Sequence, residues 1–214
     1  MSQIKKEAYT VQIVKRLEGA YPAAHIVLNY GSTLELLITV ILSAQCTDVK
    51  VNQVSASLFK KYRTINDYAD ADQSDLEQAI RPTGFFRNKA KNIMGAARKI
   101  REDYSGEVPH TMAEIITLPG VARKTGNIVL YNAYGITAGI AVDTHVGRLS
   151  RRLGLSREND PVKVERDLMA LLPKEKWGGF SYLLISHGRA VCASRKAKCA
   201  DCLLKDICHS AFKV

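Results

Sequence analysis

The sequence lacks any apolar run long enough to cross a membrane. Its longest run, Leu36 to Ala44, covers 9 residues and is interrupted by Thr39 and Ser43, whereas a membrane-spanning helix needs about 20 residues. The first residues, MSQIKKE, contain no apolar stretch of the kind that an export signal requires. We therefore expect an intracellular, cytoplasmic protein without a membrane partner.

Signals for disorder, repeats and β-structure are missing as well. Polar low-complexity tracts are absent and 46% of the residues are hydrophobic, which excludes a wholly disordered chain. No unit repeats with a period of roughly 20–50 residues, and no strand-like alternation with Asn-Gly or Asp-Gly turns occurs. The 214 residues can bury a substantial core, as one large domain or two small ones.

Hydrophobic residues recur at helical spacing almost throughout the chain. Three segments, Ser32–Glu35, Ser74–Glu77 and Thr111–Glu114, have the form of a capping box, in which a hydroxyl and a carboxylate satisfy amides at a helix start. The spacing predicts helices at about 2–19, 34–45, 48–61, 74–81, 87–104, 112–117, 124–134, 144–153, 161–171 and 180–190. We therefore expect an all-α fold.

Basic residues outnumber acidic ones, because 31 Lys and Arg against 21 Asp and Glu give a formal net charge of +10. This excess predicts a polyanionic partner, most simply nucleic acid, although charge alone does not identify one. The basic residues form three groups: residues 82–101, which hold six basic and no acidic side chains; Arg148, Arg151 and Arg152; and Arg189, Arg195, Lys196 and Lys198. A single charged run is usually a solvated face, but three such groups favour contact with phosphates.

Four of the five cysteines lie within 17 residues, in the pattern Cys192-x6-Cys199-x2-Cys202-x5-Cys208. Disulfides do not persist in a reducing compartment, and four thiolates this close repel one another unless a metal holds them. Structural zinc usually takes two Cys-x2–4-Cys pairs, and only one is present, so the spacing favours an iron–sulfur cluster, with zinc as the alternative. Cys46 has no neighbouring ligand, which is typical of a buried core thiol.

A short turn, LPGVARKT at residues 118–125, joins two expected helices. It leaves the first amides of the second helix without intrahelical partners, which makes an anion site. A nucleotide-binding phosphate loop is excluded, because the second Gly is absent and the preceding element is helical. Lys124 at this helix start is a candidate nucleophile, and Asp143 opens a later helix. The simpler alternatives are a phosphate-pairing lysine and an ordinary helix-capping aspartate.

Five features follow one another along almost the whole chain: LLITVILSAQCTD (36–48), GFFRNK (84–89), LPGVARKTGN (118–127), VDTH (142–145) and the spacing of the four cysteines. Together they resemble the endonuclease III family of DNA glycosylases. The resemblance implies two helical domains flanking a DNA-binding cleft, the helix–hairpin–helix DNA glycosylase fold. A six-helix barrel with the hairpin would span residues 25–137, and a discontinuous domain with the cluster loop would combine 1–24 and 138–214. We expect a monomer.

The resemblance also implies an activity and its residues. The family's bifunctional members are base-excision-repair DNA glycosylases and AP lyases that remove oxidised pyrimidines from duplex DNA and act at abasic sites. Lys124 matches the nucleophilic lysine, which forms a Schiff base with the sugar before β-elimination cuts the strand 3′ to the lesion. Asp143 matches the catalytic aspartate. The ligands of a [4Fe–4S] cluster match Cys192, Cys199, Cys202 and Cys208.

DNA contacts follow from the same resemblance and from the basic groups. Gln45 matches a residue that fills the gap left by an extruded base, and Phe85 occupies the position of an apolar wedge. We expect DNA contacts at Gln45, Phe85, Arg87, Lys89, Gly120, Ala122, Arg123, Thr144, His145, Arg195, Lys196 and Lys198. Sequence-tolerant contacts of this kind would associate the protein with the nucleoid.

Three residues depart from the family's pattern. Ala122 replaces the second Gly of the hairpin, at a cost of about 1–2 kcal/mol if that position needs a left-handed backbone. Gly126 replaces an Ala, which would soften its helix by about 1 kcal/mol. Phe85 is bulkier than the usual wedge. These changes leave the chemistry in place and bear on lesion preference and rate.

Two other functions fit part of the sequence. An adenine glycosylase that acts opposite oxidised guanine shares the hairpin, the aspartate and the cluster. It typically lacks the nucleophilic lysine and carries a glutamate in the segment matching residues 36–45, where this chain has only Glu35 just outside. A non-enzymatic helix–hairpin–helix module would explain the charge and the hairpin, but not Lys124 and Asp143 in a chain with a cysteine loop.

Overall fold

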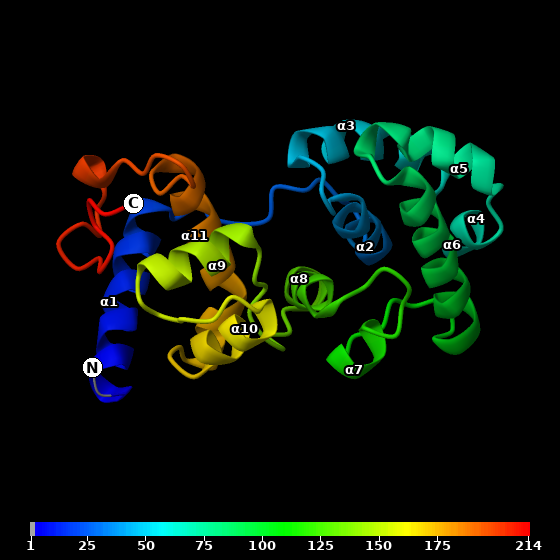
Figure 1. Cartoon of the computed structure of the whole chain (residues 1–214). Coiled ribbons are helices and arrows are strands. Elements are labelled where there is room, and N and C mark those ends of the chain that lie inside the picture. The colour runs from blue at the N-terminus through cyan, green and yellow to red at the C-terminus, as the bar shows by residue number, and fades with distance from the viewer. Residues whose placement is uncertain (1–2) are drawn as a thin grey trace. The chain divides into compact units, whose positions relative to one another are not determined.

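A computed structural model describes residues 3–214, and this part of the chain is helical without a β-strand (Figure 1). The helices are α1 (Gln3–Ala20), α2 (Thr33–Leu42), α3 (Asp48–Lys61), α4 (Ile65–Ala69), α5 (Gln73–Ile80), α6 (Phe86–Asp103), α7 (Met112–Ile115), α8 (Arg123–Tyr134), α9 (Thr144–Arg152), α10 (Pro161–Met169) and α11 (Trp177–Ala190). Short 3-10 turns lie at Arg81–Thr83, Lys174–Lys176 and Cys199–Asp201. No described helix has the length and apolarity needed to cross a membrane.

The chain forms two compact units, one of residues 27–138 and one that combines residues 1–26 with 139–214. The sequence predicted the first of these units at residues 25–137, so it begins two residues later and ends one residue later than predicted. The second unit is discontinuous because α1 packs against α11, at the other end of the chain.

The unit of residues 27–138 is built around α2. All seven residues from Leu36 to Leu42 are buried, and a helix that is buried on every side belongs at the centre of a core. Helices α3, α6 and α8 pack against α2, while α4 and α5 pack against α6. The core therefore fixes both ends of α2 and the first turn of α8, where candidate functional residues lie.

The discontinuous unit has its own core. Ile13 and Leu17 of α1 are fully buried together with Leu149 of α9 and with Phe180 and Leu184 of α11. The Tyr9 hydroxyl donates a hydrogen bond to the carbonyl of Leu153 or of Ile207, both 3.0 Å away. This hydroxyl ties α1 to the C-terminal loop that carries the cysteines.

At two of the three expected capping boxes the hydroxyl cap is confirmed, but the carboxylate does not bind the N-cap amide. The Ser32 hydroxyl accepts a hydrogen bond from the Glu35 amide at 3.2 Å, and the Thr111 hydroxyl accepts one from the Glu114 amide at 3.3 Å. In the first case the Glu35 carboxylate accepts from the Gly31 amide, at 2.6 Å, one residue before the position that a capping box uses.

The third expected cap is wrong. Asp72, not Ser74, caps α5, because the Asp72 carboxylate accepts from the Asp75 amide at 3.0 Å. A complete capping box occurs instead at Thr64 and Asp67, at the start of α4, a helix that the sequence analysis did not predict. With five residues, α4 is too short to show helical periodicity.

Several helix ends also differ from the prediction, by one to three residues. Helices α7 and α10 each end two residues early, and α11 begins three residues early. The helix expected at 34–45 ends at Leu42, because Ser43 caps it and Gln45 turns into the left-handed region with φ 52°. The helix expected at 2–19 is α1, and residue 2 of that prediction lies outside the described residues.

Candidate active site and cysteine loop

A tight turn of residues 116–122 joins α7 to α8. Gly120 adopts a left-handed φ of 76°, and a Cβ atom on it would lie 2.8 Å from the Cβ atom of Asn92 on α6. Only glycine meets both conditions without strain or a clash. The Val121 amide closes the turn on the Leu118 carbonyl at 3.1 Å.

The two departures from the family's hairpin pattern have local explanations. Ala122 has an extended backbone, with φ −87° and ψ 171°, so no left-handed strain arises there. At Gly126, a Cβ atom would lie 3.0 Å from the Met112 sulfur and 3.1 Å from the Ile115 Cγ2 atom. Side chains of α7 therefore occupy the space that an alanine methyl would fill.

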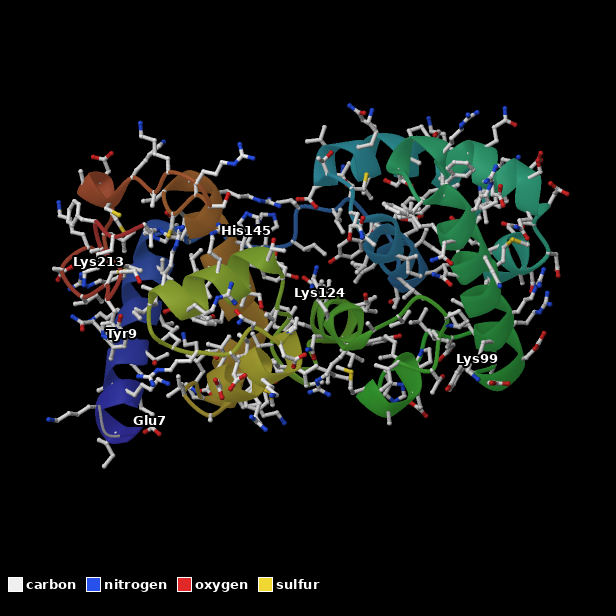
Figure 2. The ribbon with its side chains drawn as sticks, viewed as in Figure 1. Glu7, Tyr9, Lys99, Lys124, His145 and Lys213 are labelled. Atoms are coloured by element: carbon white, nitrogen blue, oxygen red, sulfur yellow. The ribbon has the colours of Figure 1, made fainter. Side chains whose placement is uncertain are left out.

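Lys124 lies in the first turn of α8, and its side chain is exposed (Figure 2). The helix begins at Arg123, and its N-cap residue Ala122 has no side chain that accepts a hydrogen bond from the first amides. The helix start thus presents backbone N–H donors and a primary amine together.

Asp143 is the N-cap of α9, as the simpler interpretation of the sequence holds. Its Oδ1 atom accepts a hydrogen bond from the Val146 amide at 2.8 Å. Its Oδ2 atom lies 3.4 Å from His145 Nδ1, and the side chain is 20% exposed. Capping therefore uses one carboxylate oxygen and leaves the other beside His145.

Gln45 and Phe85 share an unusual backbone. Both are non-glycine residues in the left-handed region, with φ 52° and 48°, a conformation that costs about 1–2 kcal/mol at each position. Both side chains are exposed, Phe85 to 65%. Gln45 follows α2 and Phe85 directly precedes α6, so each lies in a short loop held by a helix end.

Lys89 is not a surface residue, which corrects its assignment to the DNA contacts. It is 4% exposed, and its Nζ atom donates to the carbonyl oxygens of Leu42 at 2.7 Å and Thr83 at 2.8 Å. Burial lowers the pKa of Lys89, and the nearby Cys46 thiol acts in the opposite direction. A buried amine bound to two carbonyls cannot reach a phosphate.

The rest of the predicted basic helix is also partly engaged within the protein. Arg98 donates to the Ala69 carbonyl at 2.8 Å, and Arg101 pairs with Asp70 at 2.8 Å. Arg87 is different, because its side chain is 82% exposed and lies 3.9 Å from the Glu77 carboxylate. Arg87 therefore stays a candidate phosphate contact on this helix.

The basic group on α9 supports the cysteine loop. Arg148 donates to the Cys192 carbonyl at 3.0 Å, while Arg152 donates to the Ala193 and Ser194 carbonyls at 2.7 and 2.9 Å. These two arginines were expected to contact phosphates, and the structure assigns them this internal role. The exposed cations of the cysteine loop are Arg195, Lys196, Lys198 and Lys205, and the Lys205 amine donates to the Ala200 carbonyl at 2.8 Å.

All four clustered cysteines line one cavity in the discontinuous unit. Its lining includes Arg152, His187, Lys198 and Lys205 and no acidic residue. Burial raises the pKa of the Cys202 and Cys208 thiols. Within residues 3–214, no group of three or more His, Cys, Asp or Glu side chains is arranged to hold a metal ion.

Hydrogen-bond donors surround the sulfur atoms of this cavity. The Arg152 guanidinium lies 3.2 Å from Cys192 Sγ, and the Leu204 amide lies 3.4 Å from Cys202 Sγ. The buried His187 places Nε2 3.4 Å from Cys202 Sγ and Nδ1 3.0 Å from the Tyr21 hydroxyl. These contacts come from Tyr21, directly after α1, and from Cys202, 15 residues along the chain, so the sequence around His187 does not show them.

Comparison with known proteins places this chain among DNA repair proteins. The model of the HhH-GPD superfamily base excision DNA repair protein family matches residues 38–174. Endonuclease III of Synechocystis sp. is 53% identical over 206 residues, which cover 96% of this chain and 94% of that protein. Endonuclease III of Bacillus subtilis is 45% identical over 199 residues, which cover 92% of this chain and 90% of that protein.

Solved structures give the same result. A trapped endonuclease III–DNA covalent intermediate, an estranged-adenine complex, is 40% identical with a TM-score of 0.93, over 100% of this chain and 98% of that one. A non-covalent endonuclease III–DNA complex is 41% identical with a TM-score of 0.92, over the same shares of the two chains. This chain belongs to the endonuclease III family of DNA glycosylases and AP lyases, within the HhH-GPD superfamily of base excision DNA repair proteins.

Proposed function

We propose that this protein removes oxidised pyrimidines from duplex DNA and then cuts the strand 3′ to the lesion, with Lys124 as the nucleophile. The observation that carries the proposal is the exposed Lys124 amine in the first turn of α8, directly after the hairpin. The similarity to a trapped endonuclease III–DNA covalent intermediate supports it, because such a complex requires a nucleophile on the protein.

The reaction begins when the neutral Lys124 amine attacks C1′ of the damaged nucleotide. The glycosidic bond breaks, and the base leaves with the bonding electron pair and takes up a proton. The sugar ring then opens at its C1′–O4′ bond, O4′ takes a proton that the amine sheds, and a Schiff base joins Lys124 to C1′. Because the imine withdraws electrons, a proton leaves C2′ and the C3′–O bond breaks, so the phosphate departs by β-elimination.

Asp143 has a charge role in this reaction. Positive charge develops on the sugar as the base leaves, and a fixed carboxylate stabilises it. The Val146 amide holds one oxygen of Asp143 in place, so the carboxylate is oriented before substrate binds.

Gln45 and Phe85 serve extrusion of the damaged nucleotide. A base inside a duplex cannot be reached, so the nucleotide must rotate out of the stack, at a cost of a few kcal/mol. An inserted side chain offsets part of that cost by filling the gap or separating the neighbouring bases. Both side chains are exposed and sit on left-handed, constrained backbone, which suits insertion.

The remaining DNA contacts are to the backbone. The hairpin supplies amides around Gly120, Ala122 and Arg123, and the helix start after Asp143 supplies Thr144 and His145. Exposed cations come from Arg87, Arg195, Lys196 and Lys198. Contacts of this kind give sequence-tolerant and salt-sensitive binding, which would keep the protein on the nucleoid while it searches for rare lesions.

We infer from their spacing and their shared cavity that Cys192, Cys199, Cys202 and Cys208 are the ligands of a [4Fe–4S] cluster. They line a single cavity without acidic residues, and N–H groups donate to two of the sulfurs; such donors stabilise thiolate ligands and tune a cluster of this kind. A bound cluster would hold the short 192–208 loop in one shape. The loop would then present Arg195, Lys196 and Lys198 in fixed positions.

A panel of duplexes tests the proposed activity. We expect the purified protein to excise an oxidised pyrimidine such as thymine glycol and to cleave at an abasic site, leaving a β-elimination product. Duplexes with uracil or with adenine opposite oxidised guanine should react at least about tenfold more slowly. Preferred excision of that adenine without strand cleavage would instead favour the adenine glycosylase, and binding without any cleavage would favour a non-enzymatic module.

A further inference from the structure

The exposed loops that carry Gln45 and Phe85 are joined by one buried side chain. The Lys89 amine donates to the carbonyl of Leu42, three residues before Gln45, and to the carbonyl of Thr83, two residues before Phe85. The distances are 2.7 and 2.8 Å.

Lys89 is also fixed to the Phe85 loop through its own backbone. Its amide donates to the Phe85 carbonyl at 3.0 Å in the first turn of α6. The side chain then crosses to the C-terminal end of α2, where the unpaired carbonyls of a helix end accept hydrogen bonds. Lys89 therefore contacts three backbone carbonyls: those of Thr83 and Phe85 in the Phe85 loop, and that of Leu42 at the end of α2, before Gln45.

The choice of lysine at this buried position calls for a reason beyond packing. A buried amine is costly unless it is hydrogen-bonded, and methionine of similar length would fill the same space without that cost. What methionine cannot do is bind two carbonyls that belong to separate loops. The left-handed residues Gln45 and Phe85 need such support, since strained backbone persists only where its surroundings hold it.

We propose that Lys89 is a positioning residue that couples the two loops, so that Gln45 and Phe85 enter the duplex as one unit. The proposal rests on the proposed function of both side chains in base extrusion. Lys89 itself touches neither DNA nor the reacting atoms. Its contribution is confined to substrates in which a paired nucleotide must be extruded.

The experiment compares two substrates under single-turnover conditions. The first is a duplex with thymine glycol, which requires extrusion, and the second is a single strand with an abasic site, which has no opposite base and no gap to fill. We expect Lys89→Met to slow excision from the duplex by about tenfold or more while it changes cleavage of the single strand by less than about twofold. Lys60→Met removes the same charge from an exposed position on α3 and is the matched control.

A double-mutant cycle separates positioning from general destabilisation. In the background Gln45→Ala/Phe85→Ala the loops have nothing to insert, so adding Lys89→Met should change duplex excision by less than about twofold. Amide exchange gives a readout that is independent of activity. We expect Lys89→Met, but not Lys60→Met, to speed exchange at the Cys46 and Gly84 amides by about tenfold or more.

The possible results are distinct. Three results would each overturn the role of Lys89. The first is an equal loss of rate on both substrates in Lys89→Met, and the second is an undiminished loss when Lys89→Met is added to Gln45→Ala/Phe85→Ala. The third is unchanged amide exchange at Cys46 and Gly84. A wild-type protein that cleaves neither substrate overturns the proposed function, and the exchange measurement then decides whether Lys89 still joins the loops. If Lys89→Met does not fold, Lys89→Gln, which keeps an N–H donor at shorter reach, takes its place in every arm with the same expected direction.

Discussion

Asp143 accepts a hydrogen bond from the Val146 amide at 2.8 Å, so the proposed catalytic carboxylate is also the N-cap of α9. The structural and the functional interpretations of Asp143 are therefore both required. Capping needs only a side-chain oxygen acceptor, whereas stabilising a positive sugar needs the negative charge. The two roles can be separated by substitution.

Replacing Asp143 with Asn or Ala separates capping from charge. Asp143→Asn keeps a good N-cap and should leave the free energy of unfolding within about 0.5 kcal/mol, because Asn and Asp cap equally well. It should slow base excision by about 100-fold or more, since the charge is lost. Asp143→Ala should add a loss of about 1 kcal/mol in stability. Thermal unfolding and single-turnover excision measure the two effects, and an Asn variant with wild-type excision would contradict the charge role.

Gly120 should tolerate substitution less well than Gly106, although both have positive φ. At Gly106, with φ 82°, an added Cβ atom meets nothing within 4 Å, so alanine should cost about 1 kcal/mol from backbone strain alone. At Gly120 the backbone strain is the same, and in addition an added Cβ atom would lie 2.8 Å from the Cβ atom of Asn92. We expect Gly120→Ala to destabilise by roughly 2–4 kcal/mol, or to reshape the hairpin and weaken DNA binding. Equal unfolding free energies and DNA affinities for the two variants would argue against a close fit at Asn92.

Tyr68→Phe should stabilise the protein. The Tyr68 hydroxyl is buried and has no hydrogen-bond partner within residues 3–214, and burying an unpaired hydroxyl is unfavourable by about 1 kcal/mol or more. Chemical denaturation of both proteins at neutral pH measures the difference. A destabilised phenylalanine variant would show that the hydroxyl is satisfied in solution.

The same tyrosine predicts a pH dependence. Burial raises the pKa of Tyr68 above its ordinary value, so above pH of about 10 the unfolded chain loses this proton while the folded protein keeps it. The free energy of unfolding therefore falls as the pH rises above that value, by up to about 1.4 kcal/mol per pH unit. Tyr68→Phe should remove that part of the slope between pH 10 and 11, and parallel slopes would contradict it.

Loss of any clustered cysteine should remove the proposed cluster. Wild-type protein should contain about four iron atoms and four acid-labile sulfides per chain and absorb broadly near about 400 nm. Cys202→Ser should lose most of both, whereas Cys46→Ser should keep them, because Cys46 lies in the other compact unit. Elemental analysis of the three proteins checks this, and a colourless wild-type protein with stoichiometric zinc would contradict it.

Local signals in the sequence located most elements, and tertiary contacts explain the misses. The bounds of α3 were predicted as Asp48–Lys61 and are confirmed. They were predictable because hydrophobic periodicity and helix capping depend on residues that are close in the sequence. The position of Gly120 in the hairpin turn was predictable for the same reason. The early end of α2 was not, since the left-handed backbone at Gln45 depends on what surrounds it.

Side-chain roles set by long-range packing were the least predictable. Lys89 occurs in a run of basic residues and looks like a surface cation, but its acceptors are the Leu42 and Thr83 carbonyls, which only folding brings to it. Arg152 likewise looked like a phosphate contact and binds the cysteine loop. Nothing in residue order shows which of several equivalent cations will meet a free carbonyl.

The identity of the nucleophile is the central claim, and reductive trapping tests it most directly. Wild-type protein, a duplex with an abasic site and sodium borohydride should give a covalent complex, and peptide mapping should place the adduct on Lys124. Lys124→Ala should give no complex while it still binds a duplex with a tetrahydrofuran site, which shows that the variant is folded. An adduct on another residue, or trapping of Lys124→Ala at the wild-type yield, would contradict the account.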